Sequence, residues 1–251
     1  MDTTYSNRIS DEGGVRPLST ALKTIAVLEV LAKSPRGMRL QEIATSLGLS
    51  RPTAYQRLLT LSEAGLIEQD DQSRYRLSMH LCRFAAAALE QADLGTRVLP
   101  ILQNLVHEVK ETASLAVLDR GQPCIVSRVE SDSVLRAEQK IGTTMSLEGS
   151  ASGRILTAFA DEATLRRLKE SGEELAADEI IAEARLNGYA LSSGYTQAGV
   201  RAIAAPVFDL QGRCAATVSL VMPATRFQLE QFKAPLLRAA EDVTRLQQGL
   251  R

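Results

Sequence analysis

The sequence predicts an α+β fold with an N-terminal winged helix-turn-helix, a linker helix and a C-terminal domain of mixed helices and antiparallel strands. Three observations predict it. Two short amphipathic helices meet at a glycine within residues 39–67, an alanine-rich segment follows, and the remaining sequence alternates helical periodicity with β-hairpin patterns. The expected parts are a disordered tail over residues 1–17, the winged helix-turn-helix over 18–78, the linker helix over 79–92 and the C-terminal domain over 93–251.

The first expected helix lies in the segment STALKTIAVLEVLAKSPRG. Ser19 suits the N-cap position, and Pro35 and Gly37 mark the end of the helix. The apolar residues expected to face inward are Leu22, Ile25, Leu28 and Leu31. This helix completes a three-helix unit with the pair that follows it.

The glycine-joined pair has the spacing of a helix-turn-helix. Gly48 supplies the left-handed conformation that ends the first helix, and Ser50 is a suitable N-cap for the second. Pro52 lies in the first turn of that second helix, where a missing amide proton costs nothing. The residues expected to face inward are Leu40, Ile43 and Leu47 on the first helix and Ala54, Leu58 and Leu61 on the second.

The opposite side of the second helix carries side chains suited to DNA. Gln56 and Arg57 can form paired hydrogen bonds to adenine and guanine edges, and Thr53 and Tyr55 can reach phosphates or a thymine methyl group. The pattern favours a DNA-binding surface. The alternative is an ordinary helical hairpin, because amphipathic helices joined by a glycine also occur in proteins that never contact DNA.

A wing follows the helix pair in the sequence LIEQDDQSRYRLS, which predicts two short strands around a polar turn at Asp70–Ser73. Arg74 and Arg76 alternate with Tyr75 and Leu77, so one strand face carries both cations while the other packs inward. Beside a recognition helix, these cations suit phosphate or minor-groove contacts. The full set of predicted DNA-binding residues is Arg39, Ser50, Arg51, Pro52, Thr53, Tyr55, Gln56, Arg57, Arg74 and Arg76.

The charge distribution agrees with a double-stranded DNA partner. The formal net charge is -1, yet residues 18–57 hold six Lys or Arg against two Glu, which gives +4 by subtraction. A small local basic excess suits a protein that makes few phosphate contacts per module and multiplies them by dimerisation.

Composition excludes several other classes. Hydrophobic residues make up 45% of the chain and charged residues 24%, as in ordinary globular proteins. The longest apolar runs are too short for a membrane span and the N-terminal segment lacks an apolar signal core, so we expect a cytoplasmic protein without a membrane partner. Cys82, Cys124 and Cys214 are odd in number and far apart, which predicts small buried thiols rather than disulfides or a zinc site. No cofactor or metal is expected.

The C-terminal part alternates helices and strands. MHLCRFAAAALEQA predicts one stiff linker helix, and Asp93 can cap a further helix that places Val98, Leu102, Leu105 and Val109 along one side. One hairpin is expected to turn at Gly121 and Gln122, VLRAEQKI to form a third strand, and a second hairpin to turn at Gln211 and Gly212. SASGRILTAFA, DEATLRRLKES and DEIIAEARLNG predict helices with capped starts, and FQLEQFKAPLLRAAEDVTRLQQGL predicts a long amphipathic helix. Helices on one sheet would leave a cavity at one end.

Two regions together carry a family resemblance. LGLSRPTAYQRLLTLSEAGLIE followed by YRLS, and SLEGSASGRILTAF with GYTQAGVRAIAAPVFD, resemble the isocitrate lyase regulator (IclR) family of bacterial transcription factors along nearly the whole chain. The resemblance implies a winged helix-turn-helix, a linker helix and a C-terminal effector-binding domain similar to the GAF fold. It also implies a regulator that acts as a homodimer, or as a dimer of dimers, on palindromic promoter sites.

The resemblance also implies a small-molecule effector pocket. The backbone amides of Ala151 and Ser152, at a helix start, favour an anion such as a carboxylate, and Ser219 offers a further hydrogen bond. The residues carried over as effector-binding are Ala137, Met145, Ala151, Ser152, Ser192, Val200, Ala202, Ser219 and Val221.

Three positions depart from the family pattern. Ser192 stands where an acidic residue is frequent, Ala202 where a cysteine is frequent and Glu148 where a histidine is usual. Without that carboxylate and thiol, the pocket favours a more apolar effector, such as an aromatic carboxylate or a related hydrazide or amide.

Catalytic motifs are not predicted. GSASGR lacks the Gly-Lys-Ser/Thr ending of a phosphate-binding loop, and both histidines, His80 and His107, lie on predicted helices rather than beside a serine nucleophile. We therefore expect no catalytic residue and no enzyme. Two other classes stay open: a stand-alone sensor that signals through a protein partner, and a hydrolase of unknown type.

The expected mechanism is a population shift. An effector that closes the cavity would bias the linker helix over residues 79–92 and change the spacing of two winged helices in a dimer. Coupling of this kind is typically about 1 to 3 kcal/mol.

Overall fold

The computed structural model divides the chain into two compact units, residues 1–89 and 90–251. The residues that it describes are 16–91, 94, 97–133, 139–193 and 199–249. Of the predicted tail over residues 1–17, all but the last two residues lie outside these ranges.

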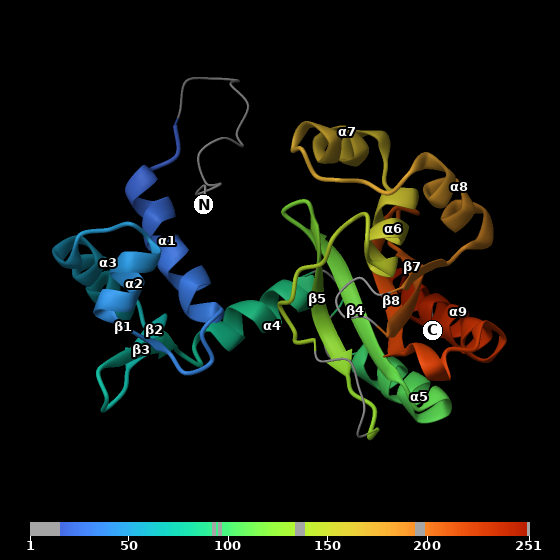
Figure 1. The fold of residues 1–251 in the computed structure, drawn as a ribbon, viewed down its shortest axis with the longest axis horizontal. Helices are drawn as coiled ribbons and strands as arrows, with labels where there is room; N and C mark the ends of the chain where they lie inside the picture. The colour runs from blue at the N-terminus through green and yellow to red at the C-terminus, as the bar shows by residue number, and fades with distance from the viewer. Residues whose placement is uncertain (1–15, 92–93, 95–96, 134–138, 194–198, 250–251) are drawn as a thin grey trace. The chain divides into compact units, whose positions relative to one another are not determined.

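The N-terminal unit combines three helices with a small antiparallel sheet (Figure 1). The helices are α1 (Ser19–Ala32), α2 (Leu40–Ser46) and α3 (Arg51–Glu63). The strands are β1 (Met38–Arg39), β2 (Ile67–Gln69) and β3 (Arg74–Leu77), in the order β1-β3-β2. The buried residues of its core are Val27, Leu31, Ile43, Leu58, Leu61, Ile67 and Tyr75.

The predicted helix-turn-helix is confirmed in its details. Gly48 has φ +62° between α2 and α3, which is a conformation that side-chain-bearing residues rarely adopt. The Ser50 hydroxyl accepts a hydrogen bond from the backbone amide of Thr53 at 3.3 Å, so it satisfies one of the free amides at the start of α3. Ala54 is buried beside Leu58 and Leu61, as the spacing predicts.

Two predictions for α1 are wrong. Ser19 is the first residue of the helix and Leu18 holds the N-cap position without a side-chain hydrogen bond. Ile25, which was expected to face inward, is 43% exposed. Val27, which was not, is fully buried in the core. The apolar residues of α1 continue around the helix, so their spacing alone leaves the buried face ambiguous by about one residue.

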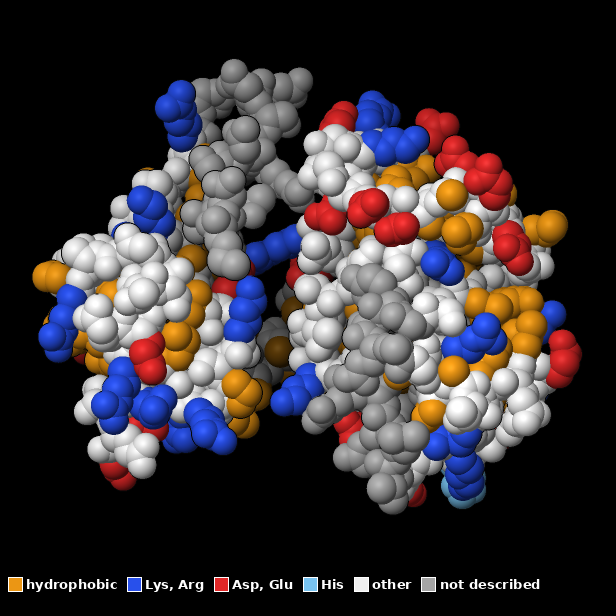
Figure 2. Space-filling view, in the orientation of Figure 1, with side chains coloured by type: hydrophobic (Ala, Val, Ile, Leu, Met, Phe, Trp, Pro, Cys, Tyr) orange, Lys and Arg blue, Asp and Glu red, His pale blue; other side chains and the backbone are white. Residues whose placement is uncertain are grey.

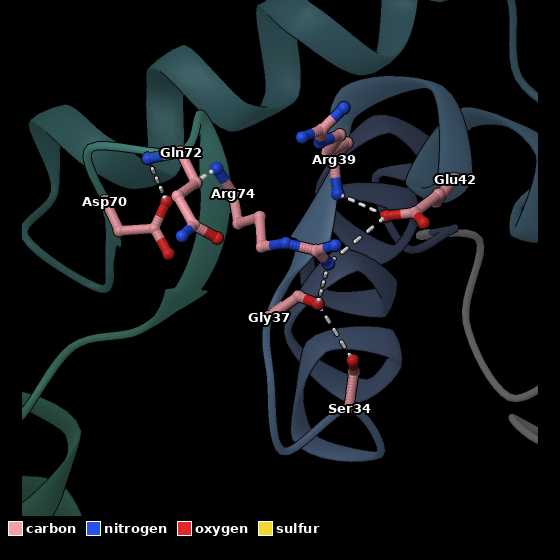
Figure 3. Close-up of polar contacts among 7 residues, drawn as sticks. All are labelled: Ser34, Gly37, Arg39, Glu42, Asp70, Gln72 and Arg74. Atoms are coloured by element: carbon pink, nitrogen blue, oxygen red, sulfur yellow. Dashed lines mark hydrogen bonds and ion pairs between the residues drawn. The ribbon is translucent and has the colours of Figure 1, made fainter.

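The wing turn forms as predicted, around the side chain of Asp70. Its Oδ1 accepts hydrogen bonds from the backbone amides of Gln72 and Arg74, each at 2.9 Å (Figure 3). Ser73 completes the turn with φ 58°. A second hairpin tip in the C-terminal unit repeats this arrangement around Asp209, whose Oδ1 accepts from two backbone amides at the same distance.

Helix α4 (Leu81–Gln91) occupies the predicted linker segment and crosses the division between the two units in the sequence. None of its residues is buried, and Phe84 is 57% exposed. His80 lies in the turn before α4, so the prediction that it sits on a helix is wrong. Cys82 is exposed, contrary to the expectation of a buried thiol, while Cys124 and Cys214 are half-buried.

The C-terminal unit is built on a five-stranded antiparallel sheet in the order β5-β4-β8-β7-β6. The strands are β4 (Thr112–Asp119), β5 (Gln122–Val129), β6 (Ala190–Ser193), β7 (Val200–Phe208) and β8 (Cys214–Pro223). The helices are α5 (Leu99–Val109), α6 (Ala151–Ala158), α7 (Glu162–Glu170), α8 (Asp178–Asn187) and α9 (Leu229–Gln247), with a short 3-10 helix η1 (Ala224–Arg226).

Helices cover both faces of this sheet (Figure 1). Helix α6 packs against alternate residues of β7, Ala202 and Ala204, together with Ala184 of α8. Helices α5 and α9 pack together and against the strands on the other face. Because Ile203 between those alanines is also fully buried, β7 is apolar on both sides.

Several predicted details of this unit need correction. The first hairpin turns at Arg120 and Gly121, with φ 49° and 85°, and Gln122 already pairs with Asp119. Two successive positive φ values are the geometry that a two-residue hairpin loop requires. Helix α8 begins without the predicted side-chain cap, since Ala177 holds that position, whereas Ser150 and Asp161 do cap α6 and α7.

Most of the predicted third strand, VLRAEQKI, lies outside the described residues. Residues 134–138 lie outside the described ranges, and residues 139–141 are not in a strand. Residues 142–145 lie beside β5 instead, through hydrogen bonds such as that from the Met145 amide to the Pro123 carbonyl at 2.8 Å. Strand β6 was not predicted. The proposed cap Asp93 also lies outside the described residues, and α5 begins at Leu99, one residue after buried Val98.

Candidate functional site

The exposed side of α3 is the first candidate site. Arg51, Pro52 and Gln56 are exposed, and Tyr55 is 51% exposed. Leu59 adds an apolar side chain that is 49% exposed. These five residues form the recognition face, and their position opposite the buried stripe is the one that the helical spacing predicts.

Two other predicted residues at the start of α3 are engaged locally. The hydroxyls of Ser50 and Thr53 lie 2.7 Å apart and share a hydrogen bond, and Ser50 also caps the helix. Their side chains therefore hold the helix start in shape.

Arg57 does not join the recognition face. Its side chain is half-buried and turns toward α1, where Nη1 donates to the Thr20 carbonyl at 3.0 Å and to Thr24 Oγ1 at 3.3 Å. The predicted base contact from Arg57 therefore needs a side-chain rearrangement, because in this structure the guanidinium ties α3 to α1.

The wing cations are also held by the protein (Figure 3). Arg74 donates to the Gly37 carbonyl at 3.3 Å and lies 3.9 Å from Glu42 Oε2. Arg76 pairs with Glu68 across the wing strands at 2.8 Å. Arg74 thus joins the wing to the start of α2. Of the two arginines, Arg76 is the more exposed to solvent.

Arg39 remains directed outward. Its backbone amide donates to Glu42 Oε2 at 2.6 Å, which caps the start of α2, while Figure 3 shows its guanidinium pointing away from Glu42 and Arg74. Figure 2 shows further Lys and Arg side chains gathered around the wing. The N-terminal unit therefore presents a recognition helix beside a basic surface, as a major-groove reader does.

The second candidate site is built by the strand register of the C-terminal unit. Directly opposed residues of an antiparallel pair share a face of the sheet. Ser192 of β6 lies opposite Ala202 of β7, which lies opposite Val221 of β8. Ala204 lies opposite Ser219 in the same way, so these side chains line one face, the face on which α6 packs.

The start of α6 covers this face of the sheet. Ser150 Oγ accepts from the Gly153 amide at 2.9 Å and donates to the Ser146 carbonyl at 2.6 Å. A Cβ on Gly153 would lie 2.3 Å from the Ser146 carbonyl oxygen and 2.5 Å from Cα of Leu147. Only glycine therefore allows α6 to approach the loop that carries Met145.

A cavity of about 420 Å³, including the solvent at its open mouth, lies between the start of α6 and the sheet. We call it the inner cavity. It is lined by Gln139, Met145, Ser150, Ala151, Ser152, Ser192, Val200, Arg201, Ala202, Ser219 and Val221. Eight of the nine predicted effector residues lie in this lining, and the ninth, Ala137, falls outside the described residues.

Three lining residues were not predicted: Gln139, Ser150 and Arg201. Ser150 was recognisable as a helix cap, and a cap lies beside the amides that it leaves free. Arg201 lies between Val200 and Ala202 on β7, and strand alternation turns its side chain away from theirs. Gln139 was assigned to the predicted third strand, whereas in the structure it is not part of a strand.

Buried hydroxyls give the inner cavity its polarity. Ser152 is 3% exposed and Ser192 is 9% exposed, and neither hydroxyl has a hydrogen-bond partner among the described residues. Ser219 Oγ has a weak contact of 3.5 Å to the Ser114 carbonyl. Since buried polar groups normally find partners, these serines suit a ligand or water that completes their hydrogen bonds. Within the described lining no carboxylate is present.

Reactive groups are few in the described part of the chain. Burial raises the pKa of the Cys214 thiol to about 12, and burial also raises the pKa of Cys124, so both thiols stay protonated at neutral pH. No cluster of three or more His, Cys, Asp or Glu suited to a metal ion occurs among the residues described. None of the helices in those ranges is long and apolar enough to cross a membrane.

Comparison with known proteins agrees in both units. The model of the IclR helix-turn-helix domain matches residues 20–71, and the model of the bacterial transcriptional regulator IclR C-terminal domain matches residues 86–245. The HTH-type transcriptional regulator BhcR of Paracoccus denitrificans is 31% identical over 249 residues, which cover 93% of this chain and 88% of the relative.

Two solved structures have the same fold. An IclR transcriptional regulator from Alicyclobacillus acidocaldarius superposes with a TM-score of 0.80 at 26% identity, covering 92% of this chain and 100% of that one. An IclR homologue from Microbacterium hydrocarbonoxydans, complexed with 4-hydroxybenzoate, superposes with a TM-score of 0.78 at 21% identity and the same coverage.

Proposed function

Since this chain belongs to the IclR family of DNA-binding transcriptional regulators, whose C-terminal domain binds effectors, we propose that its own effector is an aromatic carboxylate or a related hydrazide or amide. The effector occupies the inner cavity and changes the affinity of the protein for a palindromic promoter site. Regulation rather than catalysis is the role of the relatives named above.

The lining of the inner cavity carries this proposal. The free amides at the start of α6, near Ala151 and Ser152, attract a carboxylate. Met145, Val200, Ala202 and Val221 supply apolar walls for a ring. No described lining residue is acidic, so the many hydroxyls of a sugar acid would lack carboxylate acceptors. The related structure that holds 4-hydroxybenzoate supports the same ligand class.

The DNA contacts that we propose come from two elements. Arg51, Tyr55 and Gln56 of the recognition face enter the major groove, and Arg39 and Arg76 contact phosphates beside it. A homodimer, or a dimer of two dimers, places two such units on the half-sites of a palindrome. This function places the protein in the cytoplasm with the DNA.

Coupling between the sites is proposed to pass through α4. Alanine-rich helices are stiff. A conformational change in the C-terminal unit is therefore transmitted along α4 to the winged helix, because the linker does not bend. The effector then needs only a differential affinity of about 1 to 3 kcal/mol between two states to change promoter occupancy.

The experiment is calorimetric titration of the full chain with 4-hydroxybenzoate, its hydrazide and glyoxylate. We expect binding of the aromatic ligands and weaker or no binding of glyoxylate. Ser152→Val removes a cavity hydroxyl and adds bulk, and it should weaken aromatic acid binding about tenfold. Ser46→Ala, an exposed serine on α2, is the control and should bind as the unchanged protein does. Tight glyoxylate binding without aromatic binding would reject the proposed ligand class.

A further inference from the structure

A second pocket adjoins the inner cavity at strand β6. This outer pocket measures about 310 Å³ including its open side. Its lining residues are Arg154, Leu191, Ser192, Ser193, Arg201 and Phe227. Ser192 and Arg201 also line the inner cavity, so the two spaces share a wall.

Arg201 is held in place at this pocket by an aromatic ring. Its guanidinium carbon lies 5.0 Å from the centroid of the Phe227 ring, and its Nε is 3.4 Å from Ser193 Oγ. Ser193 lies opposite Arg201 in the pairing of β6 with β7. A guanidinium over a ring keeps its charge while losing mobility, and the two terminal nitrogens of Arg201 have no protein partner in the described chain.

Arg154 reaches the same pocket from α6. Its Nε donates to the Glu148 carbonyl at 2.8 Å and its Nη1 donates to the Leu191 carbonyl at 2.5 Å. Both partners are neutral backbone groups, so they fix the side chain without cancelling its charge. Its Nη2 is left with no partner among the described residues.

Among the described residues, Arg154 and Arg201 differ from four other arginines of the C-terminal unit in having no carboxylate partner. Arg213, Arg226, Arg238 and Arg245 each form an ion pair with a carboxylate. Within the described part of the chain, neither Arg154 nor Arg201 has one. Two guanidiniums with unused donors that line one pocket suit the charge and the acceptor oxygens of a carboxylate or phosphate.

We propose that the outer pocket is an anion-binding site that takes a carboxylate or phosphate group between Arg154 and Arg201. The group belongs either to a free anion or to the far end of a ligand whose near end occupies the inner cavity. The second source rests on the proposed function, whereas the first does not. In either case Arg201 sets which ligands the C-terminal unit prefers.

The test uses calorimetry on the full chain in a buffer free of phosphate and carboxylates. Inorganic phosphate probes a free anion, and benzoate compared with benzene-1,4-dicarboxylate probes a second acid group on one ligand. Arg201→Gln removes the positive charge and keeps a polar side chain beside the Phe227 ring. Arg166→Gln is the matched control, because this exposed arginine on α7 lies outside both linings and its loss changes net charge equally.

We expect Arg201→Gln to weaken phosphate binding about tenfold, or to abolish a similar preference for the dicarboxylate over benzoate. Arg166→Gln should change neither. The site is overturned if the unchanged protein shows no phosphate binding and no preference for the dicarboxylate, or if both substitutions act equally. Failure of benzoate to bind, with Arg201-dependent phosphate binding retained, would reject the aromatic effector and leave the anion site standing.

Discussion

Arg57 Nη1 donates to the backbone carbonyl of Thr20 at 3.0 Å, so the arginine at the centre of α3 ties that helix to α1. A second bond to Thr24 Oγ1 at 3.3 Å reinforces the contact. Neighbouring Gln56 points to solvent. Adjacent residues of one helix thus differ: Arg57 ties α3 to α1, whereas Gln56 is exposed, and we propose that it contacts bases.

Gln56→Ala and Arg57→Ala should therefore affect DNA binding differently. Gln56→Ala is expected to weaken a specific site by about 1 to 3 kcal/mol and leave random DNA almost unchanged, because it removes a base contact. Arg57→Ala should weaken both together and lower the thermal stability of the N-terminal unit. Fluorescence anisotropy with a specific and a scrambled duplex measures the two effects. A loss confined to the specific site for Arg57→Ala would return this residue to the recognition face.

Local signals made much of the fold predictable. Gly48 and Ser50 mark the helix-turn-helix by backbone and capping preferences that act within a few residues. The direction of the Arg57 side chain was not predictable, because a long, flexible side chain at the edge of a helix takes its direction from a distant partner, here on α1. Strand β6 escaped prediction because it has four residues and pairs with β7 alone.

The cavity was predicted far better than its surroundings. Its residues lie in motifs that the family resemblance aligns, and the strand register then brings them together. The outer pocket had no such signal. Arg154 and Arg201 are 47 positions apart by subtraction, and only the folded sheet brings them to one space.

Gly153→Ala should disturb both the inner cavity and the stability of the fold. The added Cβ would meet the Ser146 carbonyl and Leu147 at distances that real structures do not show, so the loop that carries Met145 must move. We expect a loss of effector affinity of at least about tenfold and a destabilisation of about 1 to 3 kcal/mol. Calorimetry and thermal unfolding measure these. Gly172→Ala is a useful contrast, because its Cβ meets no atom and any cost arises from its φ of +72°.

Glu111 and Arg226 form a two-point ion pair that joins the start of β4 to η1, at 2.5 and 2.8 Å. Glu111 is 4% exposed, whereas the Arg226 side chain is 36% exposed. Arg226→Ala should cost about 3 kcal/mol, because it leaves a buried carboxylate without its partner. Glu111→Gln should cost less, about 1 kcal/mol, since the exposed arginine regains water.

Urea unfolding monitored by circular dichroism compares the two variants. Glu108→Gln is the control, because its pair with Arg238 is half exposed on both sides and should contribute less than about 1 kcal/mol. Equal costs for Arg226→Ala and Glu108→Gln would show that burial of Glu111 does not govern the stability of this pair.

The three thiols should react at very different rates. Cys82 is exposed on α4, while burial raises the pKa of Cys214 to about 12. At pH 8 the Cys214 thiolate fraction is then about one in ten thousand, so iodoacetamide should modify Cys82 first and Cys214 last. Mass spectrometry of timed digests measures the order. Labelling of Cys214 should rise with pH until the fold is lost, and rapid labelling at pH 8 would contradict its burial.

We propose that this chain couples an effector in the C-terminal unit to promoter binding by the N-terminal unit. Fluorescence anisotropy of the full chain on DNA from its own upstream region, with and without 4-hydroxybenzoate, tests it most directly. We predict sequence-specific binding whose affinity changes by a factor of about 5 to 150 when the effector is present. Binding without sequence preference would favour a stand-alone sensor that acts through a protein partner, and specific binding that no aromatic acid alters would contradict the proposed effector.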